Sequence, residues 1–469
     1  MKLTGFLFAA ALLGACTQPA AEENYTRHVD PKIGTGGHGH VFVGANVPFG
    51  LVQVGPTSIP QTWDWCSGYH ASDSTVIGFS HTHLSGTGIG DLFDITVMPV
   101  VGEVTYARGE ENDPASGLWS YADRTREITK PGYYSVPLVR YGITAELTAT
   151  ERVGLHRYTF PASDAAAVVF DLENGGCWDK ATDTGFRFSD DSTRIAGWRC
   201  STGWAKNQEV YFVAEFSKPA KGISYLQPGE IDDSKMPRIA ARYARVDFDT
   251  AEGEQVLVKV ALSPVSIKGA KANLAAELPG WDFDATAAAA DKAWNDELSK
   301  VKIETEDETS KRIFYTALYH TMVAPSLFCD VNGDYRGADG KVHENPGRDT
   351  YTTFSLWDTY RAAMPLMTVL HPERMPDIIQ TMLHIADEQG RLPVWHLWGN
   401  ETDCMVGNPG IVAVADAIVK GIGGFDREKA FETIRKTAMN PDRGNGLRME
   451  YGYIPCEMFN EAVAYDMEY

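Results

Sequence analysis

The feature that most constrains this chain is a change of hydrophobic period near residue 268. Before it, short β-type runs such as 133–141 and 255–263 alternate with clusters of Gly, Pro and Asp. After it, apolar residues recur at helical spacing, for example in 375–389. A single layer architecture does not satisfy both periods, so we expect a multidomain β + α protein.

Three consecutive parts are predicted in the ordered region. Residues 25–268 carry many short strands with turn signals, which is typical of a β-sandwich. Residues 269–302 are interpreted as linker helices. Residues 303–469 suit an α/α barrel or bundle, because successive helical patterns are joined by polar loops. Its first helix is expected to begin at a capping box on Thr305, and further helices are expected at 356–369, 375–389, 411–421, 426–439 and from 460 onwards.

The last of these helices reaches Tyr469 without a cap, Gly or Pro. The helical patterns after Val301 account for about half of an (α/α)6 barrel by length and number. We therefore expect this chain to contain only the N-terminal part of such a barrel.

The N-terminus predicts export. Residues 1–16 read as a lipoprotein signal peptide, in which a positive start precedes an apolar run too short to span a bilayer. Leu13-Gly14-Ala15-Cys16 resembles a lipobox, whose cysteine is lipidated, and residues 17–24 would form a tether. The alternative is an ordinary signal peptide. We expect a bacterial lipoprotein, periplasmic or anchored in the outer membrane, that meets the membrane only through its lipid.

Charge excludes several classes of partner. The 63 acidic residues exceed the 42 Lys and Arg and give a net charge of -21, which repels nucleic acids and anionic membrane surfaces. A neutral glycan fits better. The cysteines include Cys177 and Cys200, the most plausible disulfide pair, although free buried cysteines fit equally well.

One stretch, residues 393–407, reads PVWHLWGNETDCMVG and suits a sugar site. Indole faces stack on a pyranose, while amides and carboxylates bind its hydroxyls. The candidate residues are His396, Trp398, Asn400 and Glu401. The alternative is a capped loop with two core tryptophans, and the loop alone does not separate the two.

Two further clusters combine tryptophan with a carboxylate. Trp357 and Asp358 open an expected helix, and Trp63 and Trp65 flank Asp64 in the β region. Three such clusters in one acidic, exported chain favour a glycan cleft where the two domains meet.

Two His-x-His pairs occur, His38/His40 and His81/His83. In an extended strand both members of a pair point to one face, as transition-metal ligands do. For His81 and His83 a hydrogen-bonded structural role is at least as well supported.

Two other motifs fail on inspection. The GxGxxG match at 34–39 is not followed by a helix, so dinucleotide binding is excluded. The segment at 330–341 begins like a calcium loop, but Tyr335 stands where Gly is required and Lys341 where Glu is required. We interpret it as a hairpin projecting from the helical domain.

Together the motifs resemble glycoside hydrolase family 92, the exo-acting, calcium-dependent α-mannosidases of glycan-foraging bacteria. The resemblance spans residues 30–469 and includes IGTGGHGHVFVGANVPFGLVQVGP, WDWCSGYH, IGFSHTHLSGTGIGD, SLWDTYRA and VWHLWGNETDCMVGN. It implies a β-sandwich packed on an (α/α)6 barrel. It also implies a Ca²⁺-dependent exo-α-mannosidase that cleaves an α-1,2 or related linkage of mannose-containing glycans with inversion.

The resemblance assigns roles to several of the candidates. Asp358 would hold hydroxyls of the terminal mannose, Trp63 and Trp65 would lie on the leaving-sugar side, and Trp398, Asn400 and Glu401 would form a wall of the cleft. The family's general acid, general base and calcium contact lie in TEGN-, GNDD- and GNEP-like segments, which this sequence lacks. No catalytic residue or metal ligand is therefore assigned here, and these groups are expected beyond residue 469.

Two other functions compete with this interpretation. One is a lipid-anchored glycan-binding protein without catalysis, which the missing acid and base favour. The other is a different enzyme with a sandwich and an (α/α)6 barrel, such as a disaccharide phosphorylase. The matches at WDWCSGYH and GFSHTHLSG count against the latter.

Overall fold

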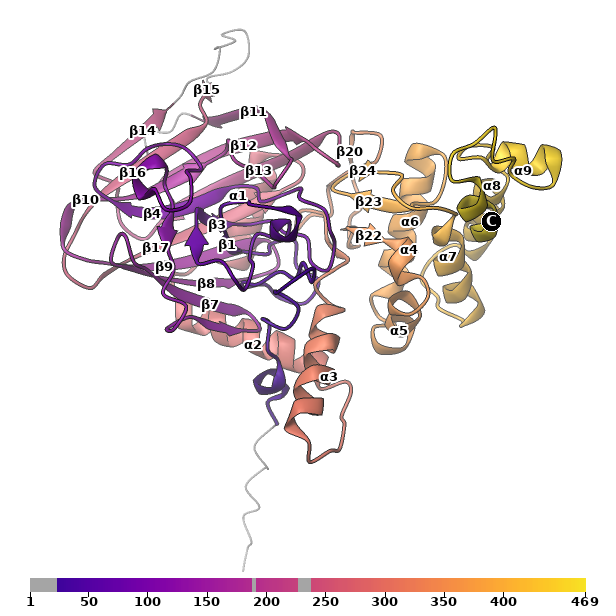
Figure 1. Ribbon diagram of the computed structural model, residues 1–469, viewed down its shortest axis with the longest axis horizontal. Coiled ribbons are helices and arrows are strands. Elements are labelled where there is room, and N and C mark those ends of the chain that lie inside the picture. Colours follow the sequence, from indigo (N-terminus) through magenta and orange to yellow (C-terminus); the bar gives the residue numbers. More distant parts are fainter. Residues whose placement is uncertain (1–22, 188–190, 227–237) are drawn as a thin grey trace, which may run out of the picture.

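The computed structural model describes residues 23–187, 191–226 and 238–469. The predicted signal peptide, the lipidation site Cys16 and most of the tether lie outside these residues. The described chain forms a two-sheet domain, followed by helices that extend away from one end of it (Figure 1).

The N-terminal domain is a sandwich of two antiparallel sheets, as predicted. The six-stranded sheet has the order β1 (Gly55–Thr57), β3 (Gly78–Ser80), β4 (Thr96–Val101), β10 (Ser163–Asp171), β16 (Tyr243–Thr250), β14 (Gly222–Leu226). The nine-stranded sheet has the order β15 (Arg238–Ala240), β11 (Lys180–Arg187), β12 (Arg194–Thr202), β13 (Gln208–Phe216), β17 (Glu254–Ser263), β9 (Val153–Phe160), β8 (Ile143–Ala149), β7 (Tyr133–Leu138), β6 (Ile128–Lys130). A small ribbon pairs β2 (Thr75–Val76) with β5 (Ser120–Tyr121), and three 3-10 turns complete the domain, η1 (Tyr25–His28), η2 (Trp63–Trp65) and η3 (Pro114–Ser116).

Aromatic side chains fill the space between the sheets. Phe170 on β10 stacks on Phe212 of β13 at a centroid distance of 5.9 Å. Phe216 of β13 meets Phe248 of β16 edge to face at 5.8 Å. Such pairs add to the burial of apolar surface that stabilises the sandwich.

Two helices cover the outer face of the nine-stranded sheet. These are α1 (Ile267–Glu277) and α2 (Phe283–Leu298), in the region predicted as linker helices. Leu274 of α1 packs with the outward-facing Leu155 and Val213 in a small core of its own. In the central strands β9, β13 and β17 both faces are therefore apolar and covered, which explains their continuous hydrophobic runs.

The remainder of the chain is mainly helical. Its helices are α3 (Glu308–His320), α4 (Leu356–Thr359), α5 (Ala363–Leu370), α6 (Met375–Gln389), α7 (Pro409–Val419), α8 (Arg427–Ala438), α9 (Asn445–Tyr451) and α10 (Ala462–Glu468). Short strands in the connecting segments form three small sheets. Two of them are pairs, β18 (Ser326–Leu327) with β21 (Tyr351–Thr352) and β19 (Tyr335–Arg336) with β20 (Val342–His343). The third has three strands, β22 (Phe354–Ser355), β23 (Trp395–Leu397) and β24 (Asn400–Glu401). The helices that the structure describes form no closed barrel.

Helix α6 confirms its predicted bounds and ends at Gly390, which has a φ of 93° and lacks the side chain that would clash there. The helix predicted at 356–369 is wrong as a single element, because it breaks between α4 and α5. Pro365 explains the break, since proline is tolerated only in the first turn of a helix. The capping box at Thr305 is also wrong. Asp307 is the N-cap of α3 and accepts from the backbone N–H of Thr309.

The predicted hairpin is confirmed as β19 and β20, but it leans against the β-domain. Arg336 donates to the carbonyl of Pro264 at 3.0 Å and forms an ion pair with Glu209 at 2.9 Å. Of the two alternatives for Cys177 and Cys200, the structure shows free cysteines and not a disulfide. Cys200 lies on β12, whereas Cys177 lies against Gly90 in the loop after β10.

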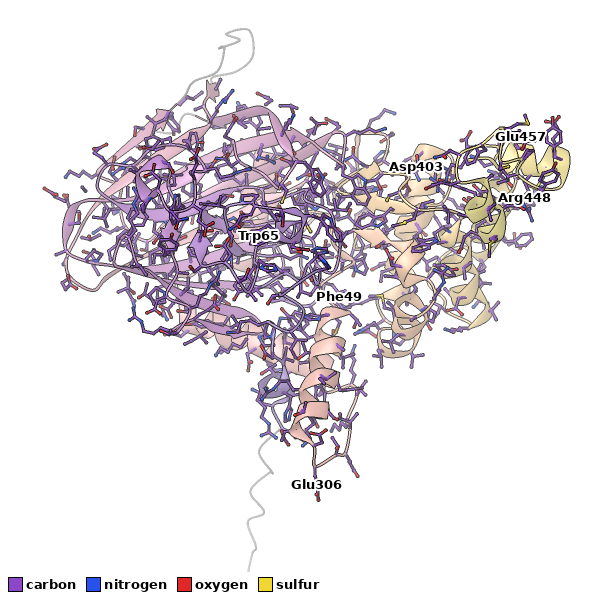
Figure 2. All side chains as sticks on the ribbon, viewed as in Figure 1. Phe49, Trp65, Glu306, Asp403, Arg448 and Glu457 are labelled. Atoms are coloured by element: carbon purple, nitrogen blue, oxygen red, sulfur yellow. The ribbon has the colours of Figure 1, made fainter. Side chains whose placement is uncertain are left out.

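Backbone and side-chain contacts join the two domains. Phe49, labelled in Figure 2, exchanges backbone hydrogen bonds of 2.8 Å with Met322 and Leu327. The Asn400 side chain accepts from the backbone N–H of Asn207 and donates to its carbonyl, each at 3.0 Å. Within the described residues, no helix has the length and apolar composition needed to cross a membrane.

Candidate functional site

A cavity of about 240 Å³ lies at the junction of the two domains. The β-domain contributes residues 85–87, and the helical part contributes the end of α3, strand β22 and helices α4 and α5. Its polar groups include those of Asp358, Thr353 and His320, while Met364 and Met367 supply an apolar side. A concave site with a few converging polar groups is typical of small-ligand binding.

Asp358 is an exposed carboxylate in this cavity. It lies in α4, where Ser355, the residue before the helix, donates its hydroxyl to Oδ2 of Asp358. The guanidinium of Arg361 lies over the neighbouring Trp357, 5.0 Å from its ring centroid. The structure therefore brings the Asp358 carboxylate to the junction, as the sequence predicted for a cleft between the domains.

His320 is a polar group of the cavity that sequence reasoning missed. Burial lowers the pKa of His320 to about 4, so its imidazole is neutral at pH 7. Its Nε2 atom is buried and has no hydrogen-bond partner among the described residues. A single histidine in the last turn of an amphipathic helix does not indicate a site. Histidine is common at this position because its protonated form interacts favourably with the negative end of the helix dipole.

The two tryptophans of η2 have different surroundings. Trp63 is 51% exposed, and its Nε1 donates to the carbonyl of Gly88 at 2.8 Å, next to the loop that lines the cavity. Trp65 is buried, donates its Nε1 to Asp73 at 2.7 Å and stacks on His70 at 4.3 Å. Only Trp63 presents an accessible indole face.

The 393–407 loop makes mostly internal contacts. The carboxylate of Glu401 accepts backbone N–H groups of Val394 at 2.8 Å, Trp395 at 2.9 Å and Asp403 at 3.0 Å. Trp398 is buried and has a φ of 46°, a conformation that costs energy in a residue with a side chain. These contacts are those of an inter-helix loop stabilised by its own hydrogen bonds.

His396 lies in the same loop and is fully buried. Burial lowers its pKa to about 3, so it is neutral at pH 7. Its Nδ1 lies 3.3 Å from the hydroxyl of Thr352. The polar groups of His396 and Asn400 therefore bind neighbouring protein segments, and they are not among the residues that line the cavity.

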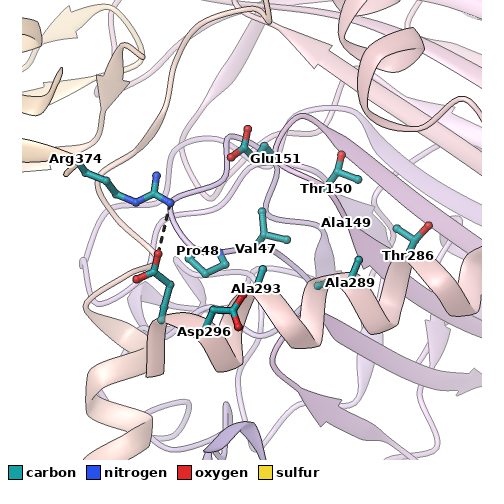
Figure 3. Close-up of a pocket in the computed structure, with 12 residues that line it drawn as sticks. Val47, Pro48, Ala149, Thr150, Glu151, Thr286, Ala289, Ala293, Asp296 and Arg374 are labelled. Carbon is teal, nitrogen blue, oxygen red and sulfur yellow. Dashed lines mark ion pairs between the residues drawn. The ribbon is translucent and has the colours of Figure 1, made fainter. Parts of the chain in front are cut away.

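A larger hollow of about 360 Å³ lies between α2 and the β-domain (Figure 3). Alanines of α2, together with Val47 and Pro48, form its apolar wall. Its charged groups are already paired, since Arg374 lies 3.5 Å from Glu297. We prefer the smaller cavity as the functional site, because it contains the exposed carboxylate of Asp358.

The four histidines of the His-x-His pairs differ in burial and in their hydrogen-bond partners. His81 Nδ1 donates to the carbonyl of Ile95 at 2.6 Å, and His83 Nδ1 to that of Gln53 at 2.8 Å. Burial lowers the pKa of His81 to about 3 and that of His83 to about 4. These two are structural histidines, whereas His38 and His40 both contact Asp64.

The described residues contain two clusters of metal-ligand type. One is His38, His40 and Asp64, and the other is Glu297, His371 and Glu373. Ca²⁺ takes six to eight oxygen ligands. Neither cluster offers such a set, so neither fits Ca²⁺.

Family models match nearly the whole chain. Residues 28–263 match the glycosyl hydrolase family 92 N-terminal domain, and residues 269–469 match the glycosyl hydrolase family 92 catalytic domain. The chain belongs to glycosyl hydrolase family 92. The two matched regions meet between β17 and α1, where the hydrophobic period changes.

Solved structures of this family have the same fold. A family 92 α-mannosidase from Bacteroides thetaiotaomicron, in complex with mannoimidazole, is 37% identical with a TM-score of 0.90, over 95% of this chain and 60% of that one. A family 92 inverting mannosidase from the same organism is 27% identical with a TM-score of 0.82, over 95% and 60%.

A secreted glycosidase of Arthroderma benhamiae, whose function is uncharacterised, is 25% identical over 94% of this chain and 56% of its own length. This family 92 chain therefore spans about three fifths of the length of the relatives it matches.

Proposed function

We propose that the protein to which this chain belongs releases terminal mannose from α-mannosides of glycans, cleaving an α-1,2 or related linkage with inversion. The observation that carries this proposal is the 37% identity and TM-score of 0.90 to an α-mannosidase in complex with mannoimidazole. The 27% identity to an inverting mannosidase supports inversion. The acidic net charge of -21 supports a neutral glycan as the partner and disfavours nucleic acid.

In this proposal the junction cavity binds the sugar. The exposed carboxylate of Asp358 accepts hydrogen bonds from hydroxyls of the terminal mannose. His320, neutral at pH 7, contributes a nitrogen without a partner, and the open face of Trp63 stacks on the neighbouring sugar. Trp65, Trp357 and the loop residues His396, Trp398, Asn400 and Glu401 hold these groups in place.

Inversion needs a carboxylic acid that protonates the glycosidic oxygen and a carboxylate that activates water, about 6.5–9.5 Å apart. Neither role is assigned to a residue of this chain. A Ca²⁺ requirement is part of the proposal through the family alone.

Export and lipidation at Cys16 are also proposed, from the lipobox-like Leu13-Gly14-Ala15-Cys16. The relative from Arthroderma benhamiae is described as secreted, which agrees with export. Labelling of cells with a fatty-acid analogue should mark the wild type and not Cys16→Ala. Equal labelling of both proteins would contradict lipidation.

Activity is tested on the protein that carries this chain, with an α-linked mannobiose as substrate. Mannose release should begin with the β-anomer in the proton NMR spectrum, stop in excess chelator and return with Ca²⁺ but not with Zn²⁺. Initial α-mannose would exclude inversion. Binding of the mannobiose without any turnover would instead favour a glycan-binding protein.

Asp358→Asn tests the assignment of the cavity. Loss of a charged hydrogen-bond acceptor, worth about 1.5–3 kcal/mol, should lower kcat/KM by about 10- to 150-fold. Asp387→Asn is the matched control, because Asp387 lies on α6 in a surface ion pair with Lys429 and does not line the cavity. Equal activity of the two variants would remove Asp358 from the site.

A further inference from the structure

His38, His40 and Asp64 form a compact cluster, here called the His-Asp cluster, on the β-domain. Nδ1 of His38 lies 2.6 Å from Oδ1 of Asp64, and Nε2 of His40 lies 3.2 Å from the same oxygen. The three possible ligand atoms all lie within 4.8 Å of one another. Ligands of one tetrahedral Zn²⁺, at about 2.0–2.1 Å from the ion, stand roughly 3.3 Å apart. The His40 contact already has this spacing.

The His38 ring can supply the remaining adjustment. Its side chain is 76% exposed, so a shift of less than about 1 Å away from Asp64 meets little resistance and reaches the spacing that a metal requires. The His40 side chain, in contrast, is only 5% exposed, and the edge of its ring packs on the Trp63 indole at a centroid distance of 4.2 Å. One ligand is thus held firmly and the other is free to move.

The backbone around His40 is bent to bring the two imidazoles together. His40 has a φ of 53°, a left-handed conformation that is strained for a residue with a side chain. Gly39 packs so tightly that a Cβ there would lie 1.7 Å from the carbonyl oxygen of Gly34. Ser67 also donates its hydroxyl to the carbonyl of His40. Residues 37–40 do not form an extended strand, and a tight bend brings the two histidines together instead. Strained backbone of this kind often marks functional positions.

The surroundings of the cluster leave room for a positive ion. Among the described residues, Asp64 forms ion pairs only with the two histidines. The second cluster differs, because Nζ of Lys300 lies 2.7 Å from Glu297 and 2.8 Å from Glu373. A lysine already provides the positive charge between those two carboxylates. Of the two clusters, only the His-Asp cluster can accept a metal without displacing a cation.

We propose that His38, His40 and Asp64 bind a divalent transition metal, with Zn²⁺ as the best match. Two imidazoles and one carboxylate are a common ligand set for this class of ion, and the exposed side next to His38 leaves a fourth position for water. The bound metal would fix the bend at 37–40 against η2 and hold Trp63 at the rim of the junction cavity. The proposal does not depend on the proposed mannosidase activity.

Binding is tested with Zn²⁺ alone on the untagged, chelator-treated chain by titration calorimetry. We expect one Zn²⁺ per chain. Titration with Co²⁺ should give a tetrahedral visible spectrum without the charge-transfer band of a thiolate, which separates this site from the free cysteines. His38→Ala should fold normally because its side chain is exposed, and it should weaken binding by more than about 100-fold, since loss of an outer-shell partner alone costs about 10- to 100-fold.

Two variants make the result decisive. Asp64→Asn should weaken binding as His38→Ala does, whereas Glu373→Gln in the second cluster should bind Zn²⁺ as the wild type does. Circular dichroism checks that every variant is folded. A folded wild type that takes up no Zn²⁺, unchanged affinity in His38→Ala, or loss of binding in Glu373→Gln would each overturn the proposal.

Discussion

The β-domain and the helical part after α4 use their apolar residues differently. Among the described residues up to 263, five large hydrophobic side chains are exposed, whereas thirteen are exposed between 366 and 469. Val419 of α7 is 85% exposed and Met467 of α10 is 83% exposed. Sheets that face each other bury both inner surfaces, while each of these helices packs on only one side.

The β-domain, in contrast, buries even charged side chains. Arg199 is fully buried between the carboxylates of Asp94 and Asp179, and its Nη1 lies 2.6 Å from Asp94. The comparison suggests that single changes inside the sandwich will be costly and that changes on the outer faces of the helices will be nearly neutral. The following predictions test this contrast.

The largest effect is expected at the buried ion cluster. Arg199→Met leaves Asp94 and Asp179 buried without their cation, which should lower the free energy of unfolding by about 3–5 kcal/mol. Arg435→Met is the control on α8, where the pair with Glu432 is exposed and should contribute less than about 0.5 kcal/mol. Urea unfolding followed by tryptophan fluorescence measures both. Equal losses would remove the contrast between the regions.

Acid should destabilise the sandwich through its buried histidines. An unfolded histidine has a pKa of about 6.5, and burial lowers the pKa of His83 to about 4. The unfolded chain therefore binds the proton first as the pH falls. The contribution of His83 is complete above pH 6.5 and decreases toward pH 4, by roughly 3 kcal/mol at most.

His83→Asn isolates this contribution, because the amide can still donate to the carbonyl of Gln53 but does not titrate. Melting temperatures measured from pH 7.5 to 4.5 should fall less steeply in the variant than in the wild type. Parallel curves would mean that His83 is not neutral in the folded state.

A smaller effect is expected where the two regions meet. Asn400→Ala removes both side-chain hydrogen bonds to Asn207 and should cost about 1–2 kcal/mol. Asn207→Ala is a matched control, because Asn207 takes part only through its backbone. Thermal unfolding should separate the two variants, and similar melting temperatures would show that this contact does not hold the domains together.

The smallest effect is expected on the outer face of α7. Val419→Lys should change the free energy of unfolding by no more than about 0.5 kcal/mol, because the side chain is already in solvent. Val414→Lys on the same helix places a charge in the core and should be strongly destabilising. Chemical denaturation compares them. A loss above about 1 kcal/mol in Val419→Lys would show that this face is covered in solution.

The local signals in the sequence were sufficient for much of the fold. Short β-type runs predicted β7 and β17, and α6 was predicted to the residue because its Pro376 and Gly390 mark both ends. The same signals failed where two local rules competed. At Thr305 and Asp307 either side chain could cap α3, and the structure selects Asp307.

The candidate site was predictable only in part. Asp358 and Trp63 were proposed from their residue types, and the structure leaves both accessible. Trp398 and Glu401 are likewise a tryptophan and a carboxylate. Trp398 is buried, however, and Glu401 accepts hydrogen bonds from backbone N–H groups of its own loop. Residue type does not distinguish an exposed indole from a buried one, because burial depends on which distant segments pack against it.

The sequence by itself determined the two kinds of secondary structure, the place where one gives way to the other and the family. These follow from periodicity and from motifs, which are properties of neighbouring residues. Only the tertiary structure decided that residues 85–87 and Asp358 share a cavity and that Asp64 joins His38 and His40. Both depend on contacts between residues far apart in the chain, which form only when the sheets and helices pack, and no local pattern encodes which distant side chains will meet.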